Sequence, residues 1–508
     1  MLELPKPSYL PSSGRQSGFL TMTMILIGIG VASLIVILLA SGLVSNPIQE
    51  TYMVPWIGLV LVVILAPIIY LSFKGQFDLF NPIVFAAWSY FLPSFVLGSL
   101  FLATHLSWPF FIHLIPDLEY YLPLSLVYVA LGFAGLTLGF FLPPGRQFGV
   151  YLAKKLPVWD WQPSELLLPG VILLGIGLFL SLISLALGVI GYQQVDAIEE
   201  YNGLVYFLSL VGNFASFILW FALFKTKKWN AYYWIVLGLL LIMVPIRVSV
   251  AGNRGSLLQL LIGVSMAYWF SGRRVKLQHG LIFGCLMSVA LIIGMAYGTT
   301  FRNLKGSESR ADFFDYFATS QRTIDKMADE GIAKNLETAG YAIGERFDTT
   351  SSLAVVVANH ENLEGYEEGY HLSNNVVNSL LTAFIPRFIW NDKPMVSDAR
   401  AYSQLYFDFG ENSFAITLMG DLLRNFGPFG VPIGMILLGI LLRIFYAALV
   451  EGQVVTAWRA GVFFMLMNSI SYEGFFDSVL PSIVRFGIVA ILSVLVIKFF
   501  SGWRVRIV

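Results

Sequence analysis

The sequence contains a single cysteine and few charged residues. Of its 508 residues only 12% are charged, and 31 Lys and Arg balance 31 Asp and Glu. A soluble globular protein carries about 25% charged residues, so the composition excludes an ordinary soluble enzyme. A chain without excess positive charge has no electrostatic attraction for nucleic acid, which we therefore exclude as a partner. The lone Cys285 excludes an intramolecular disulfide and a cysteine-rich metal site.

Several common motifs of nucleotide-binding, metal-binding and hydrolytic sites are also lacking. The sequence has no Asp-x-Asp motif, no Walker loop and no Gly-x-Ser-x-Gly. His360 and His371 lie eleven residues apart in a polar segment and do not form a His-Glu-x-x-His pattern. Nucleotide-driven transport and serine hydrolysis therefore have no support, and we expect neither a metal nor another cofactor.

Long apolar runs dominate what is present, with 57% hydrophobic residues and a mean hydropathy of +0.74. Runs of spanning length, about 20 residues, occur at 18–43, 54–73, 82–103, 121–142, 165–190, 203–224, 232–249, 255–271, 279–300, 428–449, 454–472 and 479–500. The first run is longer than the apolar region of a secretion signal and lacks an Ala-x-Ala cleavage pattern, so we interpret it as a retained span. The sequence thus predicts an all-α polytopic membrane protein with about 12 transmembrane helices.

Cations fall on alternate connections between these runs. With a cytoplasmic N-terminus, 17 of the 31 Lys and Arg lie in inner connections, and the outer connections at 44–53, 104–120 and 191–202 hold none. By the positive-inside rule both termini are cytoplasmic and residues 301–412 form one large external loop between spans 9 and 10. We therefore divide the chain into a nine-helix part (1–300), this loop, and a C-terminal part (413–508) with three helices and a short interfacial helix.

The large loop contains helix-forming segments and has ten basic and seventeen acidic residues. Residues 308–340 have apolar side chains at helical spacing and predict helices lying over the membrane. The apolar run Val376–Ile389 is too short to span, which favours a re-entrant or interfacial helix. Ser413–Phe426 predicts a second short amphipathic segment. The glutamates of 361–368 are most simply a solvated acidic loop.

Four arginines are predicted in or beside the outer half of the membrane: Arg247, Arg254, Arg424 and Arg485. An ionisable group at that depth is costly unless it is paired or faces a cavity. Each could snorkel to the headgroups or pair with a nearby acid. Because guanidinium groups bind phosphate oxygens in bidentate fashion without a metal, they could instead bind a diphosphate.

Other candidates lie in and beside the loop. Arg387 and Lys393 follow the short apolar run, where they either anchor the segment or face an anionic lipid headgroup. Arg346 is flanked by two acids, which favours an ion-pair network over a binding role. Asp421 is three residues from Arg424 and could form a simple ion pair with it. Asp421 or Glu411 could alternatively act as a general base.

The chain resembles the Wzy-type polymerases of bacterial O-antigens and capsules. The resemblance rests on Gly-Asn-Arg254-Gly, Glu345-Arg346-Phe347, the segment Ile-Pro-Arg-Phe-Ile-Trp-Asn-Asp-Lys-Pro at 385–394, and Gly420-Asp421 followed by Asn-Phe-Gly-Pro-Phe-Gly at 425–430.

This resemblance implies a GT-C-like membrane glycosyltransferase of the bacterial inner membrane, with a periplasmic loop, that polymerises polyprenyl-diphosphate-linked oligosaccharides. A polysaccharide chain-length regulator is a further implied partner. Arg254 and Arg387 would bind the diphosphate, supported by Lys393, Arg346, Arg424, Arg485 and Arg247, and Asp421 or Glu411 would be the base.

Other functions stay open at this point. An O-antigen ligase would share the lipid-linked donor and the large outer loop. A flippase or other transporter of lipid-linked oligosaccharides would need charge at the membrane midplane, where the predicted spans have almost none. An enzyme using single-sugar polyprenyl phosphate donors commonly has paired acids in the first outer loop, where this chain has only Glu50.

Overall fold

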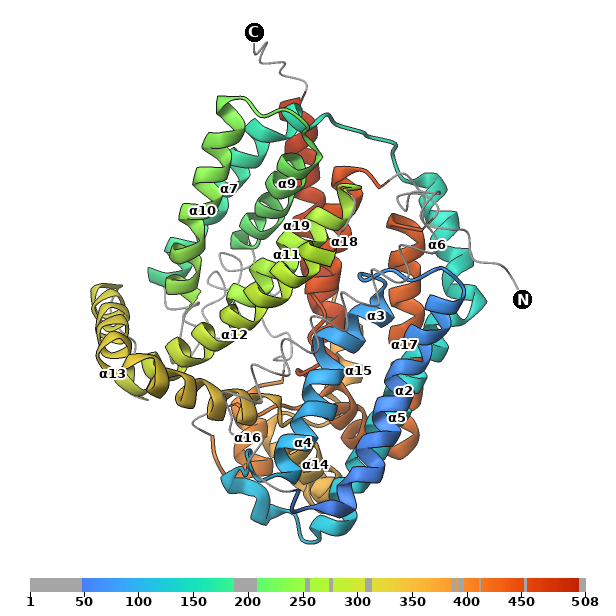
Figure 1. Ribbon diagram of the computed structural model, residues 1–508. Helices are drawn as coiled ribbons and strands as arrows, with labels where there is room; N and C mark the ends of the chain where they lie inside the picture. Colours follow the sequence, from blue (N-terminus) through green and yellow to red (C-terminus); the bar gives the residue numbers. More distant parts are fainter. Residues whose placement is uncertain are drawn as a thin grey trace.

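The computed structural model describes residues 48–186, 208–251, 256–273, 277–306, 313–385, 390, 397–410, 413–451 and 455–501. Every regular element within these ranges is a helix (Figure 1). The predicted all-α class is therefore confirmed for the part of the chain that the structure describes.

The helices before the large loop run in the following order. They are η1 (Thr51–Met53), α2 (Val54–Phe73), α3 (Pro82–Ala86), the π-helix η2 (Ala87–Leu97), α4 (Gly98–Ala103), η3 (Phe110–Leu114), α5 (Leu118–Phe141), α6 (Pro143–Lys155), α7 (Pro163–Ala186), α9 (Val211–Lys225), α10 (Ala231–Ala251), α11 (Ser256–Phe270) and α12 (Leu277–Lys305). The remaining helices are α13 (Phe313–Phe347), α14 (Thr350–Leu363), η4 (Glu364–Tyr370), α15 (Asn375–Thr382), α16 (Ala399–Phe407), α17 (Leu418–Leu449), α18 (Ala457–Asn468), η5 (Phe476–Ser478) and α19 (Val479–Ser501).

Seven segments of the described chain are long and apolar enough to cross a membrane. They are Thr51–Phe73, Pro82–Ala103, Leu118–Phe141, Pro163–Ser184, Gln278–Lys305, Leu418–Leu449 and Phe476–Ser501. Shorter apolar helices occupy Val211–Lys225, Ala231–Val244 and Gln259–Phe270. The molecule is thus a polytopic helical membrane protein, and the full set of twelve spans stays a prediction.

In the C-terminal part, two predicted spans differ from the helices observed. The run at 454–472 yields α18, whose 12 residues are about 18 Å long at 1.5 Å per residue, shorter than the membrane core. The run at 428–449 joins the preceding amphipathic segment in α17, with a break at Gly427, whose φ of +68° is accessible to glycine. The run at 18–43 lies outside the described residues.

The segment predicted to form the large loop is helical in the residues that the structure describes, and its helices gather at one end of the bundle. In Figure 1 α14 and α16 lie at the bottom, and α13 projects to the left below α12. We call this the loop end. The amphipathic pattern at 308–340 becomes α13, which bends at Gly331 (φ +76°). The short apolar run at 376–389 becomes the eight-residue α15, and residues 386–389 lie outside the described ranges.

Small residues allow α5 and α17 to pack at backbone contact. A Cβ on Gly139 of α5 would lie 2.0 Å from the carbonyl oxygen of Ile436, and a Cβ on Gly439 of α17 would lie 2.2 Å from that of Leu136. Gly132 and Gly135 line the same face of α5 at helical spacing. Lipid tails are as apolar as the helix surfaces, so the hydrophobic effect does not drive membrane helices together. They associate instead through close packing at small-residue contacts of this kind.

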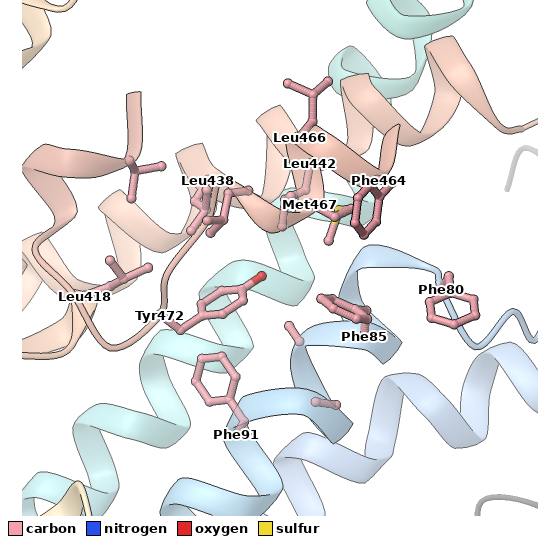
Figure 2. Packing of buried hydrophobic residues seen from close by; sticks show 14 of the residues in the cluster. Phe80, Phe85, Phe91, Leu418, Leu438, Leu442, Phe464, Leu466, Met467 and Tyr472 are labelled. Carbon is pink, nitrogen blue, oxygen red and sulfur yellow. The ribbon is translucent and has the colours of Figure 1, made fainter. Parts of the chain in front are cut away.

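The interior between α3, η2, α17 and α18 is filled by large apolar side chains. Figure 2 shows Phe85 and Phe91 beside Tyr472, with Leu438 and Phe464 contributed by α17 and α18. Phe91 packs edge-on against Tyr472, with ring centroids 5.5 Å apart. Tyr472 therefore connects this core to the turn between α18 and α19, and that turn reaches the loop end.

Candidate functional site

The residues predicted to form a site are only partly within the described chain. Asp421 and Arg424 lie in the first turns of α17, Arg346 in the last turn of α13, and Arg485 on α19, where its side chain is exposed. The backbone of Arg247 belongs to α10, but its side chain is outside the description. Four further candidates lie outside the described residues altogether: Arg254, Arg387, Lys393 and Glu411.

The start of α17 is built on a strained residue. Thr417 caps the helix by accepting the N–H of Gly420 on its hydroxyl at 3.0 Å, and its own φ is +65°. A β-branched residue rarely adopts positive φ, and such strain concentrates at functional sites. The carbonyl of Glu473 accepts the N–H groups of Ile416 and Thr417, each at 3.1 Å. The cap therefore joins the start of α17 to the turn that follows α18.

Asp421 lies one turn into α17 and is completely buried. Its Oδ1 accepts hydrogen bonds from Arg424 Nε (3.0 Å), Asn375 (3.2 Å) and Asn425 (3.3 Å). Its Oδ2 accepts the backbone N–H groups of Phe476 (2.7 Å) and Asp477 (3.3 Å). Both oxygens are thus occupied by hydrogen-bond donors. This geometry favours a positioning role for Asp421, and its role as a base stays a prediction.

Arg424 is held by two carboxylates in the interior of the loop end. Its guanidinium contacts Asp421 at 2.7 Å and Glu367 at 2.9 Å, and it donates to the Leu372 carbonyl at 3.0 Å. Its side chain is only 1% exposed. Glu367 also accepts a hydrogen bond from the Tyr406 hydroxyl at 2.8 Å. Ligand access to Arg424 is therefore closed in this structure, and the ion pair weighed from the sequence is present. We call Asp421, Arg424, Glu367 and Tyr406 the buried ion cluster.

One expectation about the acidic loop is wrong. Glu367 was assigned with its neighbours to a solvated segment, but it is 4% exposed. Its partner Arg424 lies 57 residues further along the chain, so local composition carries no sign of the contact. Burial of both charges is tolerated because each is paired and hydrogen-bonded.

Arg346 has the opposite environment at the same end of the molecule. Its Nη1 and Nη2 contact Oε1 and Oε2 of Glu473 at 2.5 and 2.6 Å, a bidentate arrangement. The side chains are 49% and 27% exposed, respectively. The acids that flank Arg346 in sequence are not its partners here, since a residue from the α18–α19 turn takes that place. Arg346 is therefore a described candidate whose guanidinium is both oriented and open to solvent.

Hydrogen bonds and close packing fix the backbone that carries Arg346. Ser99 and Thr350 hydroxyls lie 2.7 Å apart, and Ser107 donates to Asp348 at 3.1 Å. A Cβ on Gly98 would lie 1.9 Å from the Phe347 carbonyl oxygen, so α4 touches the α13–α14 junction at the backbone. Burial raises the pKa of Asp348 to about 6, although hydrogen bonds from Ser351 and Ser107 oppose the shift.

Two carboxylates of this region were not singled out from the sequence. Glu473 and Asp477 both lie in the α18–α19 turn. Asp477 is buried and accepts the Ser397 hydroxyl on Oδ2 at 2.8 Å, while its backbone carbonyl accepts the Ser379 hydroxyl at 2.6 Å. The sequence feature that could have identified Glu473 and Asp477 is their position in a short outer connection that contains acids and no cation. Among the residues that the structure describes, no group of three His, Cys, Asp or Glu side chains could hold a metal ion.

Comparison with known proteins gives no family assignment. No family model, no curated protein and no solved structure matches this chain. The site presents an accessible, oriented guanidinium beside a carboxylate, at the loop end of a polytopic membrane protein.

Proposed function

We propose that the protein is a polymerase that joins polyprenyl-diphosphate-linked oligosaccharide units into a bacterial surface polysaccharide. The observation that supports this proposal is the bidentate, half-exposed guanidinium of Arg346 where the loop helices meet the membrane-spanning helices. A guanidinium presented in this way matches two phosphate oxygens as well as it matches a carboxylate. A lipid-linked diphosphate would place its charged group at such a position while its polyprenyl chain stays in the bilayer.

The proposed reaction is a glycosyl transfer between two lipid-linked glycans. A hydroxyl group of the acceptor sugar attacks the anomeric carbon of the donor, and the polyprenyl diphosphate leaves. Fixed cations aimed at the leaving group stabilise the charge that develops on it in the transition state. Arg346 would supply one such cation, and Arg254, Arg387 and Lys393 are the proposed others. A carboxylate would accept the proton of the attacking hydroxyl.

The orientation in the membrane is part of this proposal. The bias of Lys and Arg to alternate connections supports a loop end outside the cytoplasmic membrane. The substrates would then meet the enzyme on the periplasmic side, after transfer of each unit across the bilayer.

The test is the length distribution of the surface glycan in a strain that lacks the gene. Complementation with wild type should restore a ladder of lengths, whereas Arg346→Gln should give mainly single-unit product at equal protein level. Lys334→Gln is a matched control, because Lys334 lies on the same helix in an exposed ion pair with Glu337. It should restore the ladder fully.

Other outcomes separate the alternatives. A deletion strain that attaches no glycan to lipid A, instead of a single unit, would indicate a ligase or a flippase. Failure of purified wild-type protein to elongate lipid-linked units in detergent, where no membrane barrier exists, would favour a flippase. A ladder unchanged by Arg346→Gln would contradict the role proposed for this arginine.

A further inference from the structure

The Arg346–Glu473 pair connects two rigid parts of the loop end through flexible side chains. Arg346 ends α13, whose junction with α14 is fixed against α4. Glu473 lies in a turn held by three backbone hydrogen bonds to the start of α17, two on its own carbonyl and one from Leu418 to the Tyr472 carbonyl at 3.2 Å. The Tyr472 ring is buried and stacks on Tyr90, with centroids 5.6 Å apart. The backbones are thus fixed, and the side chains can separate without moving them.

The carboxylate of Glu473 occupies the edge of the guanidinium that a phosphate would need. Both oxygens lie opposite the two Nη atoms, as two oxygens of a diphosphate would. An exposed ion pair of this kind contributes little to stability. A diphosphate, which carries more charge than a carboxylate, can therefore displace Glu473 from Arg346.

Glu473 is also better placed than Asp421 to exchange a proton. Asp421 is fully buried and both its oxygens receive several hydrogen bonds, whereas the Glu473 side chain is 27% exposed and its described polar contacts are with Arg346. The buried ion cluster supports the turn that carries Glu473, because Asp421 accepts the N–H groups of Phe476 and Asp477 from the same turn.

We infer that Glu473 occupies the diphosphate position on Arg346 in the resting protein and, once displaced by the substrate, accepts the proton of the attacking hydroxyl. This inference rests on the proposed polymerase function. In the step, the acceptor oxygen forms a bond to the anomeric carbon, and the bond from that carbon to the diphosphate oxygen breaks. Its electron pair leaves with the diphosphate, which Arg346 holds, and the hydroxyl proton passes to a carboxylate oxygen of Glu473. Substrate binding would thus release the base only when a diphosphate is present.

Binding of farnesyl diphosphate to the purified full-length protein tests the first half. Glu473→Gln should bind this probe about two- to fivefold more tightly than wild type, because the competing carboxylate is gone. Arg346→Gln should bind it about tenfold or more weakly. Glu337→Gln is the matched control, since it breaks an exposed ion pair elsewhere on α13, and it should bind like wild type. Binding by Glu473→Gln that is no tighter than binding by this control would overturn the displacement.

Elongation of lipid-linked oligosaccharides in detergent tests the second half. Glu473→Gln should lower the rate about a hundredfold or more, and added formate should partly restore Glu473→Ala, which a purely structural role would not allow. A rate within twofold of wild type for Glu473→Gln would refute Glu473 as the base while leaving the polymerase proposal intact. Wild-type protein that binds the probe but elongates nothing would refute the polymerase and the proton transfer together.

Discussion

Replacing Arg424 with methionine should destabilise the protein strongly, because it leaves two buried carboxylates without their cation. Arg424 contacts Asp421 at 2.7 Å and Glu367 at 2.9 Å, and the three side chains are no more than 5% exposed. Methionine fills a similar volume but neutralises neither acid. Removing one partner of a buried pair costs about 3–5 kcal/mol.

The size of the thermal shift follows from chain length. With an unfolding entropy of about 2.1 cal/mol/K per residue, a chain of 508 residues has about 1 kcal/mol/K in total. The loss should therefore lower Tm by at least about 3 °C. A membrane protein that keeps its helices on unfolding has a smaller entropy change, which makes the shift larger.

The assay is thermal unfolding in detergent, followed by intrinsic fluorescence of the tryptophans. Lys334→Met removes an exposed cation from α13 and should leave Tm unchanged. Adding Asp421→Asn and Glu367→Gln to Arg424→Met should recover part of the loss, because the stranded charges are then gone. If Arg424→Met and the Lys334→Met control have the same Tm, the buried ion cluster does not stabilise the loop end and the reasoning is refuted.

Three further perturbations test the structure around this cluster. Gly98→Ala should lower Tm and shorten the glycan product, because its Cβ would meet the Phe347 carbonyl at 1.9 Å, whereas Gly58→Ala on the neighbouring span has open space and should be neutral in both assays. Gly139→Ala should lower Tm by forcing α5 from α17, at a cost of about 1–3 kcal/mol, and an unchanged Tm would contradict the backbone contact. Because the folded pKa of Asp348 is raised from 3.8 to about 6, its stabilising contribution is present in full below pH 3.8 and is lost as the pH rises through 6. Relative to Asp348→Asn, wild type should therefore gain about 2 kcal/mol between pH 7 and pH 4.5, and an equal pH response of the two proteins would show that Asp348 does not titrate in this range.

Hydropathy was sufficient to predict the helical class and the seven described segments long and apolar enough to span a membrane, because each long apolar run requires only its own residues to form a helix in lipid. It failed where tertiary contacts decide helix length. The run at 454–472 ends as the 12-residue α18, since the chain turns at Ser469 toward the core position of Tyr472. The break at Gly427 is signalled by the Gly-Pro pair at 427–428, directly after the predicted amphipathic segment Ser413–Phe426.

The candidate site was predictable only in part, because its pairs join residues far apart in the chain. The contact between Asp421 and Arg424 follows from their helical spacing. By contrast, Glu367 and Arg424 are separated by 57 positions, and Arg346 and Glu473 by 127. The sequence predicts a solvated ion-pair network for Arg346 and a solvated acidic loop for Glu367, and the burial that distinguishes the two residues is not visible in the sequence.

The two arginines at the loop end have different environments, and under the proposed function Arg424 supports the structure while Arg346 supports the chemistry. Arg424 forms ion pairs with two buried acids, which neutralise its charge. Removing it should therefore lower the stability of the protein. Arg346 faces one exposed acid and can exchange that partner for a ligand at little energetic cost. Asp421 joins the two sites, because it binds Arg424 and also holds the turn that carries Glu473. A substitution at Asp421 should consequently lower both Tm and glycan length, whereas Glu473→Gln should lower only the second. Measuring Tm and glycan length for both variants would distinguish a positioning residue from a base, which a measurement of activity alone cannot do.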